Sequence, residues 1–117
     1  MDTNILRKYR KLERLGLHDV GLYNANLLCD MPNLKHLTIS YHNHEPVIER
    51  VSWIRDLEHV PIAELFVDMQ HSKPNEAIIQ VLLGLKRVVK LKIFMKRGVG
   101  IENGLKKLPN VDISYRC

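Results

Sequence analysis

The sequence predicts an α/β protein in which short parallel strands alternate with helices. Three observations carry this prediction: an apolar string recurs along the chain, apolar residues at helical spacing follow two of its copies, and no linker separates the copies. Strands that alternate with helices form parallel sheets, because each helix returns the chain to the same end of the sheet. The length of 117 residues fits one domain, so we assign residues 1–117 to a single domain.

The recurring string has apolar residues at its first, fourth and sixth positions. Its four copies begin at residues 12, 34, 62 and 88, so successive starts are 22, 28 and 26 residues apart. A degenerate fifth copy begins at residue 111, a further 23 residues on, and the Pro-Asn pair before the second copy recurs before the fifth. The four copies are Leu12-x-x-Leu15-x-Leu17, Leu34-x-x-Leu37-x-Ile39, Ile62-x-x-Leu65-x-Val67 and Val88-x-x-Leu91-x-Ile93.

Each string predicts a short strand with one buried face, because its fourth and sixth residues alternate with polar ones. The segments after the second and third strings predict amphipathic helices. Units this short cannot bury their own apolar faces, so they must stack. The expected helical stripes are Val47, Ile48, Val51, Ile54 and Leu57, then Ala77, Ile78, Val81, Leu82 and Leu85; Pro46 and Pro74 mark their first turns, behind the caps Asn43 and Ser72.

Four copies in register over nearly the whole chain resemble the leucine-rich repeat. The irregular lengths and helical spacers are most similar to the repeats of F-box and ribonuclease-inhibitor-like proteins. The resemblance implies a solenoid of four to five repeats, with strands on the concave face and helices on the convex face. This chain departs from the family three residues after each string, where the usual Asn or Cys is replaced, so we expect less regular turns. The replacing residues are Val20, His42, Gln70 and Lys96.

The repeat boundaries follow from the strings: repeats at 12–33, 34–61, 62–87 and 88–110, then a terminal strand at 111–117. Residues 4–12 align with residues 26–34, which places Leu6 on Leu28 and Tyr9 on Met31. Residues 1–11 are therefore either the end of a preceding repeat, in a fragment of a longer protein, or the N-terminal cap helix of a small solenoid. Both interpretations stay open at this point, because capping units are atypical in sequence.

Charge is distributed unevenly along the chain. Residues 1–15 carry five basic and two acidic side chains (+3), residues 16–85 four and nine (−5), and residues 86–117 nine and two (+7). A basic segment attracts nucleic acid or an acidic protein surface, but charge alone specifies no partner. The alternative is a solvated basic helix and strand.

Other features exclude several classes of protein. No apolar run approaches the roughly 18 residues of a membrane span, and the N-terminal residues lack the apolar core of a signal peptide. With only Cys29 and Cys117, the chain lacks the disulfide framework of small secreted folds. We therefore expect an intracellular protein, cytoplasmic or nuclear, with reduced thiols and no membrane partner.

The sequence gives no sign of catalysis or of a cofactor. It lacks a phosphate-binding glycine loop, a nucleophile elbow and a zinc-protease motif, so we expect no enzyme activity. Cys29 should pack against its own helix, and Trp53 should pack between helices. The cluster His42, His44 and Glu45, with His18, His36 and His71 as further candidates, is better explained as solvated histidines than as a metal site.

The residues that alternate with the buried positions predict a partner-binding face. Two aromatic residues among charges resemble the core and rim of a protein interface, although both could instead pack under a loop or a neighbouring strand. We expect Phe66 and Lys92 in one column of the sheet, and Glu64 beside Lys90, which it would partly neutralise. The predicted partner-binding residues are Arg14, His36, Glu64, Phe66, Asp68, Lys90, Lys92 and Phe94.

The leading hypothesis is a protein-protein interaction module. The resemblance further implies the substrate-recognition part of an F-box-type ubiquitin ligase, with the F-box on a separate segment. The alternative is nucleic-acid binding through the basic C-terminal repeat, which would weaken steeply as salt rises.

Overall fold

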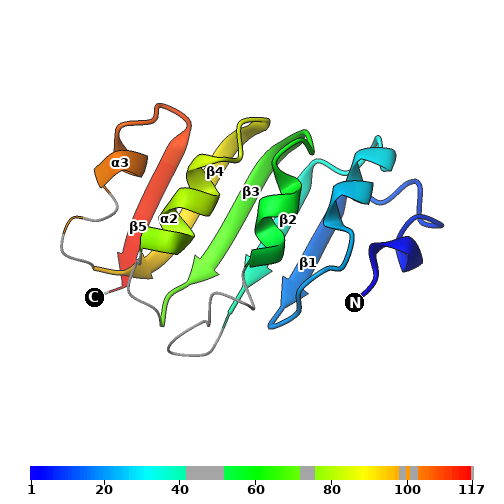
Figure 1. The fold of residues 1–117 in the computed structure, drawn as a ribbon, viewed down its shortest axis with the longest axis horizontal. Helices are drawn as coiled ribbons and strands as arrows, with labels where there is room; N and C mark the ends of the chain where they lie inside the picture. The colour runs from blue at the N-terminus through cyan, green and yellow to red at the C-terminus, as the bar shows by residue number, and fades with distance from the viewer. Residues whose placement is uncertain (42–51, 72–75, 98–99, 101–102, 117) are drawn as a thin grey trace.

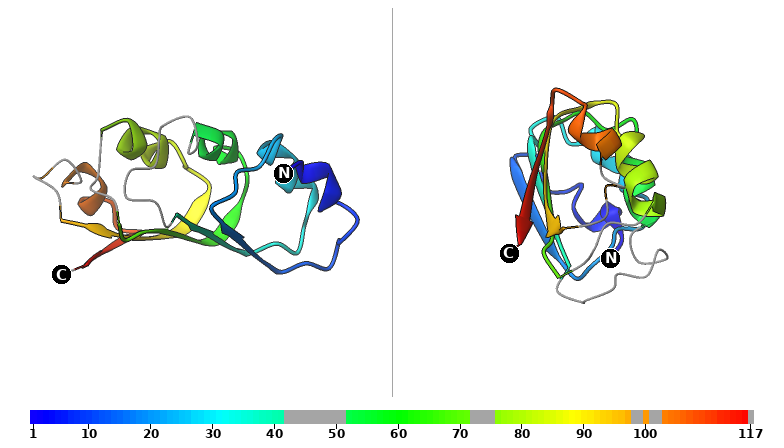
Figure 2. Two further views of the ribbon diagram at one scale, coloured as in Figure 1. Left: turned by 90° about the horizontal axis from the view of Figure 1, so that it is seen from below. Right: turned by 90° about the vertical axis from the view of Figure 1, so that its left-hand side faces the viewer.

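The computed structural model describes residues 1–41, 52–71, 76–97, 100 and 103–116. Five strands form one all-parallel sheet in sequence order, and every described helix lies on the same side of it (Figures 1 and 2). This confirms the predicted α/β architecture with strands and short helices in alternation. The strands are β1 (Arg14–His18), β2 (His36–Ser40), β3 (Ile62–Met69), β4 (Val88–Lys96) and β5 (Val111–Arg116).

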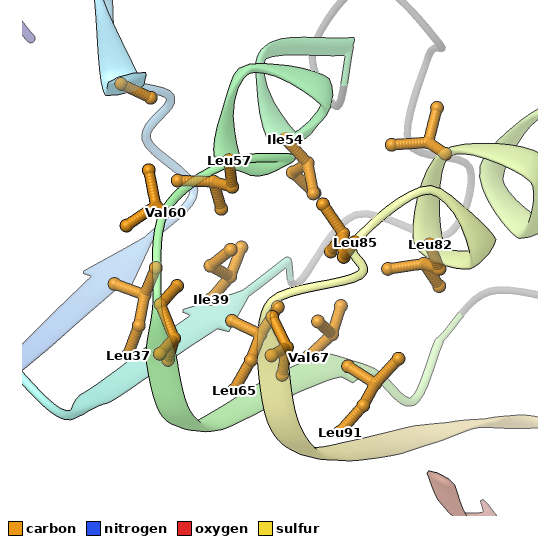
Figure 3. Close-up of a cluster of buried hydrophobic side chains, with 14 of the residues drawn as sticks. Leu37, Ile39, Ile54, Leu57, Val60, Leu65, Val67, Leu82, Leu85 and Leu91 are labelled. Atoms are coloured by element: carbon orange, nitrogen blue, oxygen red, sulfur yellow. The ribbon is translucent and has the colours of Figure 1, made fainter. Parts of the chain in front are cut away.

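The repeated string sets the register of the sheet. Leu15, Leu37 and Leu65 lie side by side on β1, β2 and β3, and Leu91 of β4 continues the column. The predicted start of the fifth string at residue 111 is wrong, because Val111 of β5 pairs with Leu91, the fourth position of its string, so the fifth string begins three residues earlier. The sixth positions form a second column of the same kind. Both columns face the helices and build one core (Figure 3). As predicted, the string residues share one face, although Leu15 on the outer strand is only partly buried.

The helical layer is built from short elements: the 3-10 helices η1 (Thr3–Ile5), η2 (Ala25–Asp30) and η3 (Ser52–Leu57), and the α-helices α2 (Glu76–Leu83) and α3 (Asn103–Lys106). Ile54 and Leu57 of η3 are buried over the sheet, as predicted. In α2 the buried stripe differs from the prediction, because Ala77 is exposed and Ile79 is buried instead. The predicted positions Asn43, Pro46, Val47, Ile48, Val51, Ser72 and Pro74 lie outside the described residues.

The prediction of a packed Cys29 is wrong, because its side chain is exposed. The reason is the helix type. A 3-10 helix has three residues per turn, so the positions that face the sheet are spaced by three. Ala25, Leu28 and the following Met31 are accordingly buried at 0%, 1% and 3% exposure. Cys29 is one step past the buried row, and its Sγ lies 3.6 Å from the His59 carbonyl oxygen.

The N-terminal residues belong to the helical layer. The Thr3 backbone N–H donates to the Tyr23 carbonyl at 3.1 Å, and η1 contacts η2 (Figure 2). The predicted match to the next repeat holds for Leu6, which is buried like Leu28. It fails for Tyr9, which is 53% exposed, whereas its counterpart Met31 is buried.

The Pro-Asn pairs have a common structural role. The Asn33 side-chain amide donates to the Arg10 carbonyl at 3.0 Å, and the Asn110 amide donates to the Val88 carbonyl at 3.1 Å. Each asparagine thus satisfies a backbone carbonyl at or before the start of the neighbouring strand. These contacts link adjacent strands near their amino-terminal ends.

Candidate functional site

The face of the sheet opposite the helices carries the candidate site, and we call it the open face. Its residues alternate along each strand with the buried residues of the core. In the described part of the chain no helix covers it (Figure 2). The open face consists of Arg14, Gly16, His18, His36, Thr38, Ser40, Glu64, Phe66, Asp68, Lys90, Lys92, Phe94, Lys96, Asp112 and Ser114.

Parallel pairing arranges these residues in columns that cross the strands. The column nearest the strand starts is Arg14, His36, Glu64 and Lys90. The next is Gly16, Thr38, Phe66, Lys92 and Asp112, and the third is His18, Ser40, Asp68, Phe94 and Ser114. All eight residues predicted for partner binding therefore lie on one face, and the two predicted column pairs, Phe66 with Lys92 and Glu64 with Lys90, are confirmed. Neighbouring strands lie about 4.8 Å apart, which makes the face continuous.

The two aromatic residues occupy the middle of the open face. Phe66 pairs with Lys92 in the register, and Phe94 pairs with Asp68, so the two rings belong to adjacent strands one column apart. Diagonal neighbours of this kind are about 7–8 Å apart at their Cα atoms, within reach of aromatic side chains. Both side chains are half-buried. They lie outside the buried core, yet each keeps apolar surface accessible to a partner.

One ion pair shapes the charge of the open face. The Glu64 carboxylate lies 3.5 Å from Lys92 Nζ, and the two side chains are 34% and 36% exposed. The expectation that Glu64 neutralises Lys90 is therefore wrong. Glu64 and Lys90 lie in the same column, as predicted. Glu64 instead forms its ion pair with Lys92, which lies diagonally across from it in the next column. Lys90 is exposed and has no ion pair among the described residues.

Polar side chains fix the corner of the open face near the ends of β1 and β2. His18 Nδ1 and Ser40 Oγ are 2.9 Å apart and join the two strands. Ser40 is 5% exposed, so its hydroxyl needs such a partner. Asp68 accepts a hydrogen bond from the Gln70 backbone N–H at 3.2 Å, which turns its carboxylate toward its own chain.

No group of metal-ligating side chains converges within the described ranges. His42, His44 and Glu45, the predicted candidates for a metal cluster, lie outside those ranges. Of the described histidines, His36 belongs to the first column of the open face and His18 to the third. Among the helices that the structure describes, none is long and apolar enough to cross a membrane.

A hollow that the sequence did not indicate lies in the helical layer. It has a volume of about 540 Å³ and is lined by residues from the N-terminus, from the turn before η2 and from η3. Its most exposed aromatic is Tyr23, at 73%. The next residue, Asn24, has a left-handed backbone conformation (φ 58°), which no sequence motif marks. The lining residues are Met1, Gly21, Leu22, Tyr23, Asn24, Ser52, Trp53, Arg55 and Asp56.

Trp53 packs in this hollow on the backbone of another unit. A Cβ atom at Gly21 would lie 2.7 Å from Trp53 Cδ1, so only glycine allows the indole to approach this closely. The indole N–H donates to the Tyr41 hydroxyl at 2.8 Å. Burial raises the pKa of the Tyr41 hydroxyl, the hydrogen bond from Trp53 lowers it, and the negative charge of Asp19 raises it. Trp53 therefore packs as predicted, but on the turn before η2 and not on a helix, and its hydrogen bond to Tyr41 lies within its own unit.

Comparison of the chain with protein-family models, with curated proteins and with solved structures finds no match in any of the three. The function must therefore be inferred from the residues of the open face.

Proposed function

We propose that this chain is a protein-interaction module whose open face binds another protein without catalysis. The observation that carries the proposal is the pair of partly exposed aromatics, Phe66 and Phe94, on adjacent strands of a face that no described helix covers. Protein interfaces concentrate aromatic side chains at their centre and polar groups around them. The columns around the two rings supply that polar rim.

The same proposal extends to a leucine-rich-repeat solenoid. One strand per repeat, the same string-to-string register from β1 to β4 and described helices on one side are what stacked repeats of this kind require. On this basis we propose an intracellular role, and the resemblance to F-box repeats adds the recognition of substrates for a ubiquitin ligase.

Nucleic-acid binding is the second candidate, supported by the basic open-face residues of β4. Lys90, Lys92 and Lys96 all belong to that strand. Acidic residues on both neighbouring strands oppose this candidate, because Glu64 and Asp112 would lie close to a phosphate backbone. Lys92 is moreover already paired with Glu64.

The test removes the two aromatics and compares the proteins that the immobilised chain retains from a nuclease-treated cell extract. The variant Phe66→Ala/Phe94→Ala should lose its retained partner by about tenfold or more, the loss typical of central interface aromatics. The matched control is Tyr9→Ala/Tyr23→Ala, which removes two exposed aromatics outside the sheet.

Both variants should melt close to the wild-type temperature, since none of the four side chains belongs to the buried core. Equal retention by the two variants would contradict a binding role for the open face. Binding that disappears after nuclease treatment and falls steeply with salt would favour nucleic acid instead.

A further inference from the structure

Strand β4 presents an ordered row of side chains on the open face. Lys90, Lys92, Phe94 and Lys96 follow one another at every second residue, so they lie on the same side of the sheet. Three are cations and one is an aromatic. The outer two, Lys90 and Lys96, are six residues apart, which corresponds to about 20 Å along an extended strand at about 3.3 Å per residue.

Of the three lysines in this row, one has an ion pair and two have none among the described residues. Lys92 is paired with Glu64 at 3.5 Å, and this pair occupies the centre. Lys90 and Lys96 have no ion pair among the described residues. The open face therefore has one positive charge without an ionic partner near each end of β4.

Between these two cations, two aromatic rings lie beside the Glu64–Lys92 pair. Phe94 lies on β4 itself, and Phe66 lies on β3 beside Lys92. Next to Phe66, the second column continues with the short side chains Thr38 and Gly16. Both residues are smaller than phenylalanine, so within this column an extended segment has room to lie against Phe66 as well as Phe94.

We infer that the open face binds an extended acidic peptide segment that runs along β4. Two carboxylates about six residues apart contact Lys90 and Lys96, and an apolar side chain between them packs on Phe66 and Phe94. This inference rests on the proposed function and names the chemistry of the partner. A charge at each end fixes the register of the segment, while the aromatic centre provides most of the buried apolar area.

A peptide fits this charge pattern better than a nucleic acid does. Phosphates follow one another at every nucleotide, so a strand along β4 would bring phosphates close to Glu64, Asp68 and Asp112. A peptide can carry carboxylates at some positions and neutral residues at others. Its neutral residues can lie beside Glu64, Asp68 and Asp112 of the open face. Like charges placed side by side in an interface oppose binding.

The experiment selects peptides from a random dodecapeptide display library on the wild-type chain and then measures the enriched peptides by fluorescence anisotropy. We expect enriched sequences with acidic residues on both sides of an aromatic or aliphatic residue. The variant Lys90→Ala/Lys96→Ala should bind them about tenfold more weakly, since each exposed charge pair contributes up to about 1 kcal/mol. Lys86→Ala/Lys107→Ala is the matched control, with the same loss of charge at two exposed lysines outside the strands.

Each outcome decides between the inference and the proposed function. Peptides that lose binding to Phe66→Ala/Phe94→Ala but carry no acidic bias, and bind the Lys90→Ala/Lys96→Ala variant normally, overturn the inference and leave the proposed function intact. Peptides that bind both open-face variants like wild type overturn both. Failure to enrich any peptide, or displacement of the peptide by an equal concentration of oligothymidylate, also overturns the inference. If Lys90→Ala/Lys96→Ala and Lys86→Ala/Lys107→Ala weaken peptide binding equally, the effect depends only on net charge. That result also overturns the inference.

Discussion

The first two units of this molecule differ from the third and fourth, although all four carry the same string. Strands β1 and β2 have five residues each, whereas β3 and β4 have eight and nine. The first spacer holds the 3-10 helix η2, whereas the third holds the α-helix α2. The shared string therefore determines the register and the buried columns, and residues outside it determine how far each element extends.

The position two residues after the string explains where the strands end. It is Met69 after β3's string and Met95 after β4's, and both side chains are buried, so the alternation of the strand continues. After the first string it is Asp19, whose carboxylate disfavours burial. The chain turns there, with Asp19 in a left-handed conformation (φ 55°). After the second string this position is Tyr41, whose side chain is buried as Met69 and Met95 are. Strand β2 nevertheless ends one residue before it, at Ser40.

The helix type does not follow from the length of the repeat. The 22-residue first repeat and the described part of the 28-residue second repeat each hold a six-residue 3-10 helix, whereas the 26-residue third repeat holds the eight-residue α-helix α2. A 3-10 helix rises about 2.0 Å per residue and an α-helix about 1.5 Å, so six residues of the first and eight of the second both span about 12 Å. The two helix types therefore cover a similar length of sheet.

The largest expected effect tests the difference in burial between the centre and the outer strand. Leu65→Ala should lower the free energy of unfolding by about 2–5 kcal/mol, because the side chain is fully buried and its loss leaves a cavity. Leu15→Ala, the same substitution in the same column of β1, should cost less than about 2 kcal/mol, because Leu15 is only partly buried. Urea unfolding followed by circular dichroism measures both. Equal losses would mean that the outer strand is as tightly packed as the centre.

A smaller effect tests the contact between the first unit and η3. Gly21→Ala places a methyl group 2.7 Å from Trp53 Cδ1, so the indole must shift away from Tyr41. We expect a loss of about 1–3 kcal/mol in the free energy of unfolding, as for other overpacked sites, together with a change in tryptophan fluorescence. Gly104→Ala in α3 is the control, since no atom lies within 4 Å of its added Cβ. It should stabilise the chain by about 0.5–1 kcal/mol through helix propensity, with unchanged fluorescence.

The smallest expected effect concerns the pH dependence of the same contact. Burial raises the pKa of Tyr41, so the folded state favours the neutral phenol. Its contribution to stability is complete below the unfolded pKa of about 10 and is lost as pH rises through the folded pKa. Thermal melts above that pH should show a shallower fall in stability for Tyr41→Phe than for wild type. The control Tyr23→Phe, at an exposed hydroxyl, should fall as wild type does; a Tyr41→Phe curve parallel to wild type would contradict the assignment.

The alternation of buried and exposed residues along each strand made part of the candidate site predictable: which residues share the open face. Alternation around the string places Phe66, Phe94 and Lys92 on one face, and equal string positions place them in columns. Which cation pairs with Glu64 was not predictable, because the choice between Lys90 and Lys92 depends on side-chain reach across a twisted pair of strands. The hollow beside Trp53 was invisible for a similar reason, since its walls come from three segments distant in sequence.

The sequence by itself determined the parallel strand order, the register of the first four strands and the two buried columns, because a recurring string leaves only one stacking that buries every copy. Only the tertiary structure decided the helix types and, with them, the exposure of Cys29 and Tyr9. Periods of 3.0 and 3.6 residues cannot be distinguished over six residues with few apolar side chains. The choice between them therefore depends on the space that the neighbouring units leave above the sheet.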